Sequence, residues 1–308
     1  MARTILVTGG AGFIGSALAY ALINRGFAVV VADNLSTGKR ENVPAEAAFI
    51  EMDMSKKEDY AKLASVQFDA VCHLAAQSSG EASFLDPQND FDSHALSTFL
   101  LLEECKRRDV RRFLYASSMA LYGDPQYQPV DEAHPANPKT YYAAGKLASE
   151  AYIKFYQSLG IETTVFRLFS VYGPNQNLDN KYQGMVSIFL SYILDNEPVH
   201  VKGARERFRD FMFIDDVVNA WLLALDNPVS YGKTYNIASG RKTTVEELIT
   251  TELECMGKPD HPVFYEGSTP GDQFGVYGSS AKLQEELGWR PEHSLKEGLT
   301  AMVQFYTR

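Results

Sequence analysis

The chain has 308 residues, of which 45% are hydrophobic and 22% charged, and its formal net charge is −10. A chain of this length can bury a substantial core, and its acidic balance argues against nucleic acid as the main partner, because phosphate backbones are held by basic surfaces. No apolar run has the length of a membrane span, the amino terminus leaves no room for a signal peptide, and the three cysteines have no paired spacing, so we expect a cytoplasmic protein with no membrane partner and no metal site.

The first predicted elements are a strand at residues 5–7, a glycine-rich turn, and a helix that begins near Gly12. Glycine at positions 9, 12 and 15 allows a sharp turn, a close approach to a pyrophosphate and tight packing of the helix on the strand. The phosphates would lie at the helix N-terminus, next to Phe13 and Ile14. This context of strand, turn and helix predicts a dinucleotide-binding site at Gly9, Gly12, Phe13, Ile14 and Gly15.

A second strand at residues 28–32 ends in Asp33, which is followed by Asn34. A carboxylate in this place can accept both hydroxyls of the adenosine ribose and would repel a 2′-phosphate, which favours NAD over NADP. Lys39 and Arg40 are close enough in sequence to weaken that argument, and Asp33 could also simply start a turn.

Strand-like and helix-like segments alternate up to about residue 168, which predicts an α/β fold with a doubly wound parallel sheet covered by helices on both faces. The expected strands are residues 5–7, 28–32, 49–52, 70–74, 112–116 and 163–168, and the expected helices start near 12, 56 and 141, with another ending near 108. After residue 173 the pattern breaks into shorter pieces. We therefore expect a cofactor domain at 1–173 with a returning segment near 214–240, and an interleaved, smaller α/β substrate lobe at 174–308.

Three polar side chains are candidates for catalysis. Tyr142 and Lys146 are four residues apart on a predicted helix and therefore share a face, and Ser118 ends the predicted strand that begins at residue 112. Ligands bind at the carboxyl ends of strands in open α/β sheets, which would bring the serine to the same place. Lowering the pKa of a tyrosine by about three units needs roughly 4 kcal/mol, which a lysine ammonium and a positive nicotinamide could supply together.

In this order, the glycine turn, Asp33, Ser118, Tyr142 and Lys146 resemble the short-chain dehydrogenase/reductase superfamily. Four more motifs narrow the resemblance to its extended branch, which acts on nucleotide sugars: Ser118-Met119-Ala120-Leu121-Tyr122-Gly123, Val171-Tyr172-Gly173-Pro174, Arg209-Asp210-Phe211 and Leu287-Gly288-Trp289-Arg290-Pro291. The resemblance covers essentially the whole chain and is specific for the branch, not for a substrate.

The resemblance implies NAD as a tightly held cofactor and epimerisation of a nucleotide-diphosphate sugar at C4, most simply a UDP-sugar. Tyr142 would exchange the O4 proton, Ser118 would hydrogen-bond O4, and Lys146 would hold the nicotinamide ribose. Further implied contacts with the cofactor are Asn34, Asp53, Met54, Leu74, Ala75, Ala76, Tyr142 and Lys146, and implied contacts with the substrate are Ser118, Tyr142, Ser170, Arg209 and Asp272. His73, beside Leu74, is equally compatible with a role in the core.

The sequence also bears on other activities of this branch, such as dehydration and decarboxylation. Met119 and Ala120 stand where dehydratases of this branch carry an acidic pair, and neither can move a proton. Dehydration and decarboxylation are therefore disfavoured, whereas a net NAD(P)-dependent oxidoreductase, another extended short-chain enzyme or a non-catalytic NAD-binding protein remain as alternatives. His94, Ser170 and Thr269 depart from the family's asparagine, asparagine and arginine, and Arg205 or Arg207 could compensate for the lost arginine.

The predicted helices around residues 91–105 and 142–155 carry apolar residues on more than one side, notably at 99–102. Surplus apolar surface often marks an interface. Related epimerases pair through the corresponding helices, so we expect a homodimer, although burial of these faces within the subunit would explain the same pattern.

Overall fold

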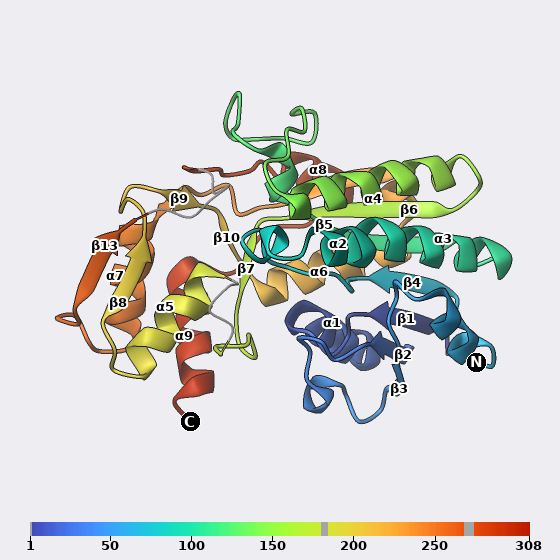
Figure 1. Ribbon diagram of the computed structural model, residues 1–308, viewed down its shortest axis with the longest axis horizontal. Helices are drawn as coiled ribbons and strands as arrows, with labels where there is room; N and C mark the ends of the chain where they lie inside the picture. Colours follow the sequence, from blue (N-terminus) through green and yellow to red (C-terminus); the bar gives the residue numbers. More distant parts are fainter. Residues whose placement is uncertain (1, 180–183, 268–273) are drawn as a thin grey trace.

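The computed structural model describes residues 2–179, 184–267 and 274–308. Its centre is a parallel sheet of seven strands in the order β11-β6-β5-β4-β1-β2-β3 (Figure 1). The strands are β1 (Thr4–Thr8), β2 (Ala28–Asp33), β3 (Ala48–Glu51), β4 (Ala70–His73), β5 (Arg112–Ser118), β6 (Glu162–Leu168) and β11 (Lys233–Ile237). The strand order reverses beside β1, which opens a crevice at the carboxyl ends of the strands. The predicted doubly wound fold is confirmed.

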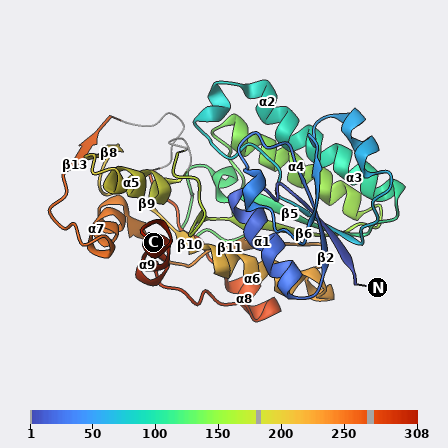
Figure 2. The same cartoon turned by 90° about the horizontal axis from the view of Figure 1, so that it is seen from below.

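Helices cover both faces of this sheet (Figure 2). α1 (Phe13–Asn24) and α6 (Ile214–Leu225) contact each other on one face, and α3 (Ser97–Arg107) and α4 (Tyr141–Gln157) on the other. Successive strand residues point to opposite faces, so Ile5 of β1 belongs to one buried cluster and Leu6 to the other. Both faces of β1 are therefore buried, which is why its sequence is a continuous apolar run.

Short helical turns complete the cofactor side. They are η1 (Arg40–Asn42), η2 (Lys57–Leu63), η3 (Ala82–Phe84), α2 (Pro87–Phe91), the π-helix η4 (Asp92–Leu96), η5 (Met119–Tyr122) and η6 (Pro228–Ser230). The helix expected near residue 56 is the 3-10 helix η2, in which Leu63 alone is buried. With only Tyr60 and Leu63 packed on the core, this segment has little of the packing that stabilises a short α-helix in water.

The smaller lobe is built from paired short strands and helices. β7 (Ser170–Tyr172) pairs with β10 (Phe211–Phe213), β8 (Val199–Lys202) with β13 (Val263–Glu266), and β9 (Phe208–Arg209) with β12 (Thr243–Thr244). The helices of the second half are α5 (Met185–Leu194), α7 (Val245–Cys255), α8 (Ala281–Leu287) and α9 (Leu295–Tyr306). In Figure 1, α5, α7 and α9 lie with β8 and β13 on the side away from the large sheet.

The chain crosses between the two halves several times. After β8 and β9 it re-enters the large sheet through α6 and β11, and β11 pairs in parallel with β6, from Lys233 beside Thr164 to Ile237 beside Leu168. β11 falls within the returning segment expected near 214–240. The division at residue 173 stays a prediction.

Among the described residues, no helix combines the length and apolar character that crossing a bilayer requires, and no group of three or more His, Cys, Asp or Glu side chains is arranged to hold a metal ion.

Candidate active site

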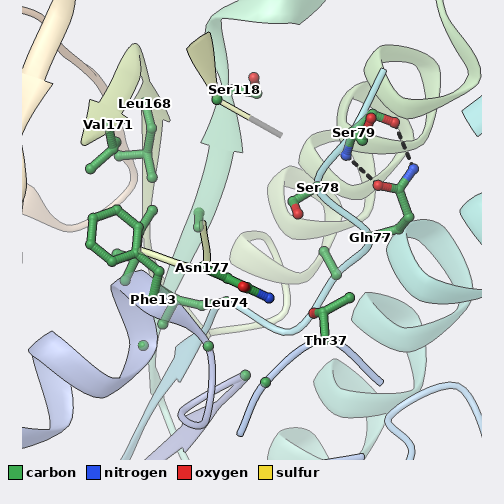
Figure 3. A pocket seen from close by; sticks show the side chains of 18 of the residues that line it. Phe13, Thr37, Leu74, Gln77, Ser78, Ser79, Ser118, Leu168, Val171 and Asn177 are labelled. Carbon is green, nitrogen blue, oxygen red and sulfur yellow. Dashed lines mark hydrogen bonds between the residues drawn. The ribbon is translucent and has the colours of Figure 1, made fainter. Parts of the chain in front are cut away.

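A cavity of about 980 Å³ lies between the carboxyl ends of the sheet and the smaller lobe. Its volume is at the upper end of the range usual for ligand sites. Every described residue that the sequence analysis proposed for the site lines it: Gly9, Gly12, Phe13, Ile14, Gly15, Asp33, Asn34, Asp53, Met54, Leu74, Ala75, Ala76, Ser118, Tyr142, Lys146, Ser170 and Arg209. Figure 3 shows Phe13, Leu74 and Ser118 around this cavity. Asp272 and Thr269 lie outside the described residues.

The glycine turn is closed tightly by backbone contacts. Gly9 has φ +71°, and a Cβ on it would lie 2.6 Å from the backbone nitrogen of Ala75. A Cβ on Gly15 would lie 2.1 Å from the carbonyl oxygen of Gly9. The N-cap of α1, Gly12, provides no side-chain hydrogen bond to the first turn. The first-turn N–H groups of α1 are thus not covered by a capping side chain, which is the arrangement that accommodates a pyrophosphate.

Asp33 is buried at the end of β2, where two backbone donors hold its carboxylate. The N–H of Ala11 donates to Oδ2 at 3.0 Å and the N–H of Leu35 donates to Oδ1 at 2.8 Å. Burial raises the pKa of Asp33, and these two hydrogen bonds oppose that shift. Each carboxylate oxygen has a further lone pair, so the group can still accept ribose hydroxyls. The residues present therefore fit the adenosine half of a dinucleotide.

The two basic residues close to Asp33 in sequence have other partners. Lys39 Nζ is 3.8 Å from a carboxylate oxygen of Asp179, and the guanidinium of Arg40 lies 4.5 Å from the centroid of the Phe49 ring. Arg40 does not line the cavity, whereas Lys39 does. These contacts weaken the sequence argument for a 2′-phosphate partner and favour NAD.

Asn34, Asp53 and Met54 lie together at the adenosine end. Asp53 Oδ1 accepts hydrogen bonds from the backbone N–H and the hydroxyl of Ser55, and hydrogen bonds of this kind, including one from the side chain of Asn34, lower the pKa of Asp53 against the effect of burial. Asp53 is therefore held as a carboxylate, and Met54 is buried beside it.

His73 belongs to the structural core of the site. Its Nδ1 is 2.7 Å from Thr8 Oγ1 and its Nε2 is 3.2 Å from Thr98 Oγ1. Thr8 Oγ1 also accepts from the backbone N–H groups of Leu74 and Ala75, each at 3.2 Å. Burial lowers the pKa of His73 to about 3, so the ring is neutral. The histidine thus fixes β1 to β4 and α3, and this network was not predicted because it joins hydroxyls far apart in sequence.

The three catalytic candidates converge at the cavity. Tyr142 and Ser118 both line the cavity, close enough for the serine hydroxyl to influence the pKa of the tyrosine, and Lys146 Nζ is 5.9 Å from the centroid of the Tyr142 ring. Lys146 Nζ also donates to the carbonyl oxygen of Ala116 at 2.6 Å, which anchors the amine to β5. The N-cap Thr140 starts the helix by accepting from the backbone N–H of Ala143, so Tyr142 lies in the first turn of α4.

Burial dominates the electrostatics of this group. Burial lowers the pKa of Lys146 to about 7 and raises the pKa of Tyr142. The hydroxyl of Ser118 acts in the opposite direction and lowers the pKa of Tyr142. The protein's own groups therefore shift the Tyr142 pKa upward, opposite to the direction that a base at neutral pH needs, because desolvation is the largest influence on it.

The smaller lobe supplies cations to the other side of the cavity. Arg209 is buried, and its Nη1 donates to the carbonyl oxygen of Phe208 at 2.7 Å. Arg207 also lines the cavity, whereas Arg205 does not and pairs with Glu246 at 3.1 Å on the surface. Of the two arginines expected as possible substitutes for the missing one, Arg207 alone is placed at the cavity.

Asp210, next to Arg209 in sequence, joins separate segments of the chain by hydrogen bonds. Its carboxylate accepts hydrogen bonds from the backbone N–H groups of Ser239, Gly240 and Gly278 and from the hydroxyl of Ser239. Ser170 lies beside it, since its backbone N–H donates to the carbonyl oxygen of Asp210 at 3.0 Å. The Arg209-Asp210-Phe211 motif therefore has an anchoring residue between two residues that face the cavity.

Among residues 2–179, 184–267 and 274–308, two ion pairs connect the cofactor side of the molecule with the smaller lobe. Besides Lys39 and Asp179, Lys202 of β8 lies 3.2 Å from a carboxylate oxygen of Glu81. Both pairs are exposed, so each contributes little to stability. Neither was predicted, because ion pairs across a cleft depend on how the two halves are placed.

Known proteins resemble the chain over nearly its whole length. The model of the NAD dependent epimerase/dehydratase family matches residues 5–238. A UDP-glucose 4-epimerase of Mycolicibacterium smegmatis is 34% identical over 308 residues, which cover 98% of this chain and 97% of that protein. The structure of the UDP-glucose 4-epimerase of Thermotoga maritima with UDP-glucose is 36% identical, with a TM-score of 0.95 and 99% of each chain covered.

The structure of the UDP-glucose 4-epimerase of Thermus thermophilus in complex with NAD is also 36% identical, with a TM-score of 0.93 and 99% of each chain covered. The range matched by the family model includes the glycine turn, Asp33, Ser118, Tyr142 and Lys146. The chain belongs to the NAD-dependent epimerase/dehydratase family.

Proposed function

We propose that this chain is an NAD-dependent 4-epimerase of a nucleotide-diphosphate sugar, with a UDP-sugar as substrate. The observation that carries the proposal is one cavity in which Ser118, Tyr142 and Lys146 lie between the glycine turn and Arg209. Three relatives with similarity over nearly the whole chain are UDP-glucose 4-epimerases, two of them in structures with UDP-glucose or with NAD.

The cofactor is held by the residues of the first half. The N-terminus of α1 would bind its pyrophosphate, Asp33 would accept the ribose hydroxyls, and Asn34, Asp53 and Met54 would enclose the adenine. Leu74, Ala75, Ala76 and Lys146 line the path to the nicotinamide. Bound NAD would supply reversible hydride transfer at C4 of the sugar and a positive charge close to Tyr142.

The proton is handled by Tyr142. The phenolate would remove the proton of the sugar O4 while the C4 hydrogen leaves as a hydride, which bound NAD would accept. The resulting 4-keto sugar would rotate about its diphosphate tether, and the phenol would return the proton to O4 as the hydride returns to the other face of C4. Ser118 donates a hydrogen bond to O4 and keeps it close to the phenol. Because burial raises the pKa of Tyr142, the ammonium of Lys146 and the charge of the bound cofactor have to oppose that shift.

The substrate diphosphate is held by the smaller lobe. Arg209 and Arg207 provide cations at the cavity, Ser170 also lines it, and Asp272 is assigned to the substrate by family resemblance alone. Charge-assisted hydrogen bonds from arginine to phosphate are the strongest of these contacts. Met119 and Ala120 also line the cavity, and neither offers the second acid or base that dehydration needs.

Proton NMR of the purified protein with NAD and UDP-galactose tests the proposal. The anomeric signal of UDP-glucose should appear until the two sugars reach equilibrium, with no accumulation of NADH. Stoichiometric NADH would support the second candidate, a net oxidoreductase that uses the same tyrosine. Absence of conversion for every UDP-sugar tried, in protein that retains bound NAD, would reject the epimerase.

The proposed assembly is a homodimer through α3 and α4. Phe155 of α4 is 59% exposed, Tyr152 of the same helix packs on Phe99 of α3, and Phe91 is exposed at the start of this helical layer. Aromatic side chains exposed together on adjacent helices favour a protein contact. Light scattering at micromolar concentration should give twice the monomer mass, and Phe155→Asp should reduce it to the monomer value.

The proposed place of action is the cytoplasm. Cys72, Cys105 and Cys255 are all free thiols, as is usual in a reducing compartment. Cell fractionation of the native protein tests this assignment.

A further inference from the structure

A buried acid–base pair lies directly behind Tyr142. Asp90 belongs to the short helix α2 and His94 to the π-helix η4. His94 Nε2 is 3.3 Å from Asp90 Oδ1, and the two side chains are 0% and 1% exposed. Single π-turns are rare and occur mostly at functional sites. Neither residue lines the cavity, so the pair can influence the reaction only through another residue.

The imidazole of His94 packs edge-on against the phenol of Tyr142. The ring centroids are 5.2 Å apart and the planes are inclined by 77°. Gly145 of α4 makes this approach possible, because a Cβ there would lie 3.0 Å from His94 Cβ and 3.1 Å from His94 Cδ2. The helix that carries Tyr142 and Lys146 is thus shaped to receive the histidine.

The pair is a poor choice for stability alone. Gln77 Nε2 donates to Asp90 Oδ1 at 3.1 Å, but in the described part of the chain Asp90 Oδ2 and both ring nitrogens of His94 have no hydrogen-bond partner. Burying an unpartnered polar group costs about 1–3 kcal/mol, and apolar side chains of similar volume would fill the same space without that cost. The arrangement therefore indicates a role in the site.

The titratable groups around Tyr142 come from several packed elements. They are the side chains of Asp90 of α2, His94 of η4, Lys146 of α4 and Tyr115 of β5. Asp90 raises the pKa of Tyr142 and opposes the lowering of the Lys146 pKa. Burial lowers the pKa of His94 to about 4, so at neutral pH the imidazole is uncharged and does not neutralise the carboxylate.

We propose that Asp90 and His94 form a positioning pair for Tyr142, in which the imidazole fixes the orientation of the phenol and the carboxylate sets the negative charge behind it. This inference rests on the proposed function, because it assumes that the Tyr142 phenol exchanges the O4 proton. His94 is one of the positions at which the chain departs from the asparagine of its family. His94→Asn is therefore the conservative variant.

The test uses the full chain loaded with NAD and compares wild type with His94→Ala, His94→Asn and Asp90→Asn. His94→Ala should lower kcat about 100-fold with little change in KM, since a small misplacement of a catalytic group has an effect of that size, and His94→Asn should restore part of the loss. Asp90→Asn should move the acidic limb of the kcat profile to lower pH.

A second readout does not need turnover. The ionisation of Tyr142 is followed by tyrosinate absorbance, as the difference between each protein and the same protein with Tyr142→Phe. Asp90→Asn should lower the midpoint of this titration. The matched control is His134→Asn, which removes a buried histidine that packs on Tyr122 and lies outside the cavity, and it should leave the midpoint unchanged.

Unchanged midpoints in Asp90→Asn, or an undiminished kcat in His94→Ala, would overturn the positioning pair. If His94→Ala does not fold, Asp90→Asn, which has nearly the same shape as the native residue, still decides. If Asp90→Asn shifts the midpoint but the wild-type protein converts no sugar, the positioning pair is upheld and the epimerase is rejected. If the wild-type protein converts the sugar but Asp90→Asn leaves the midpoint unchanged, the epimerase is upheld and the positioning pair is rejected.

Discussion

The two sides of the cavity are built on different principles. On the sheet side, the contacts come from backbone: the glycine turn, the N-terminus of α1 and a carboxylate, Asp33, held by two N–H groups. On the lobe side, the strands are short and the cavity is lined by the arginine side chains Arg207 and Arg209. The comparison teaches that the pyrophosphate part of the cofactor site depends on the absence of side chains at Gly9 and Gly15, whereas the substrate site depends on particular charged side chains.

Tyr142 lies where the two sides meet, and its removal should have the largest effect on turnover. Tyr142→Phe keeps the ring that packs on His94 but removes the group that carries the proton, so we expect turnover to fall by about 100- to 10,000-fold. The affinity for NAD and for UDP should stay close to that of wild type. The rate is measured by the NMR assay and the affinities by calorimetry. Near-normal turnover would contradict the assignment of Tyr142.

A methyl group added to the glycine turn should have the next largest effect, weakening NAD binding on the sheet side without changing UDP binding on the lobe side. In Gly15→Ala the new Cβ would meet the Gly9 carbonyl oxygen, which is backbone and cannot move away alone. We expect overpacking of about 1–3 kcal/mol, with NAD bound roughly 10- to 100-fold more weakly. UDP affinity should hardly change. Equal losses for both ligands would mean that the turn supports the whole cavity and would break the comparison.

The converse change removes a charge from the lobe. Arg209→Ala should weaken UDP-sugar binding by about 1.5–3 kcal/mol, the usual range for a hydrogen bond to a charged group, and leave NAD binding unchanged. Arg205→Ala is the matched control, because Arg205 pairs with Glu246 outside the cavity. Calorimetry with UDP measures both variants. If Arg205→Ala also weakened UDP binding, the effect would come from the overall positive charge of the lobe and not from a specific contact of Arg209.

The smallest expected effect comes from comparing two buried carboxyl groups, one on each side of the cavity. Glu252 of α7 is fully buried, and within the described residues neither of its oxygens has a hydrogen-bond partner, in contrast to Asp33. Burial raises the pKa of Glu252 well above 4.5, so this carboxyl loses its proton at a higher pH in the folded protein than in the unfolded chain. Its contribution to stability is fully present below the unfolded pKa and is lost as pH rises through the folded pKa, by up to about 1.4 kcal/mol per pH unit.

Glu252→Gln should remove this loss, so the variant should gain stability over wild type as the pH rises from weakly acidic to neutral. Urea unfolding across that range measures it. Glu254→Gln serves as control on the same helix, since Glu254 is exposed and pairs with Lys296. A wild-type curve parallel to that of Glu252→Gln would show that Glu252 has an unperturbed pKa.

The parts predicted from sequence are those that local pattern and topology determine. The glycine turn follows a buried strand, Ser118 ends β5, and Tyr142 and Lys146 share one face of α4, so the parallel sheet brings them to one edge. The lobe was predicted less fully, because the pairing of β8 with β13 joins segments about sixty residues apart. No periodicity in the sequence indicates which short strands will meet.

Side-chain contacts between elements were also beyond the sequence. His94 was noticed as a departure from the family, but its packing on Tyr142 depends on the missing side chain at Gly145 and on the π-turn of η4. Asp90 has no predicted role in the sequence analysis, although an acidic residue four positions before a histidine is a visible signal. The upward shift of the Tyr142 pKa likewise depends on desolvation, which spacing does not reveal.

β11 has a consequence for how the molecule unfolds. This strand forms one edge of the large sheet, yet it lies in sequence between two portions of the smaller lobe. Opening the lobe therefore pulls on the sheet, and the chain cannot lose one half without disturbing the other. A ligand that binds either half should raise the melting temperature of the whole protein, so that NAD and UDP report on a single cooperative transition.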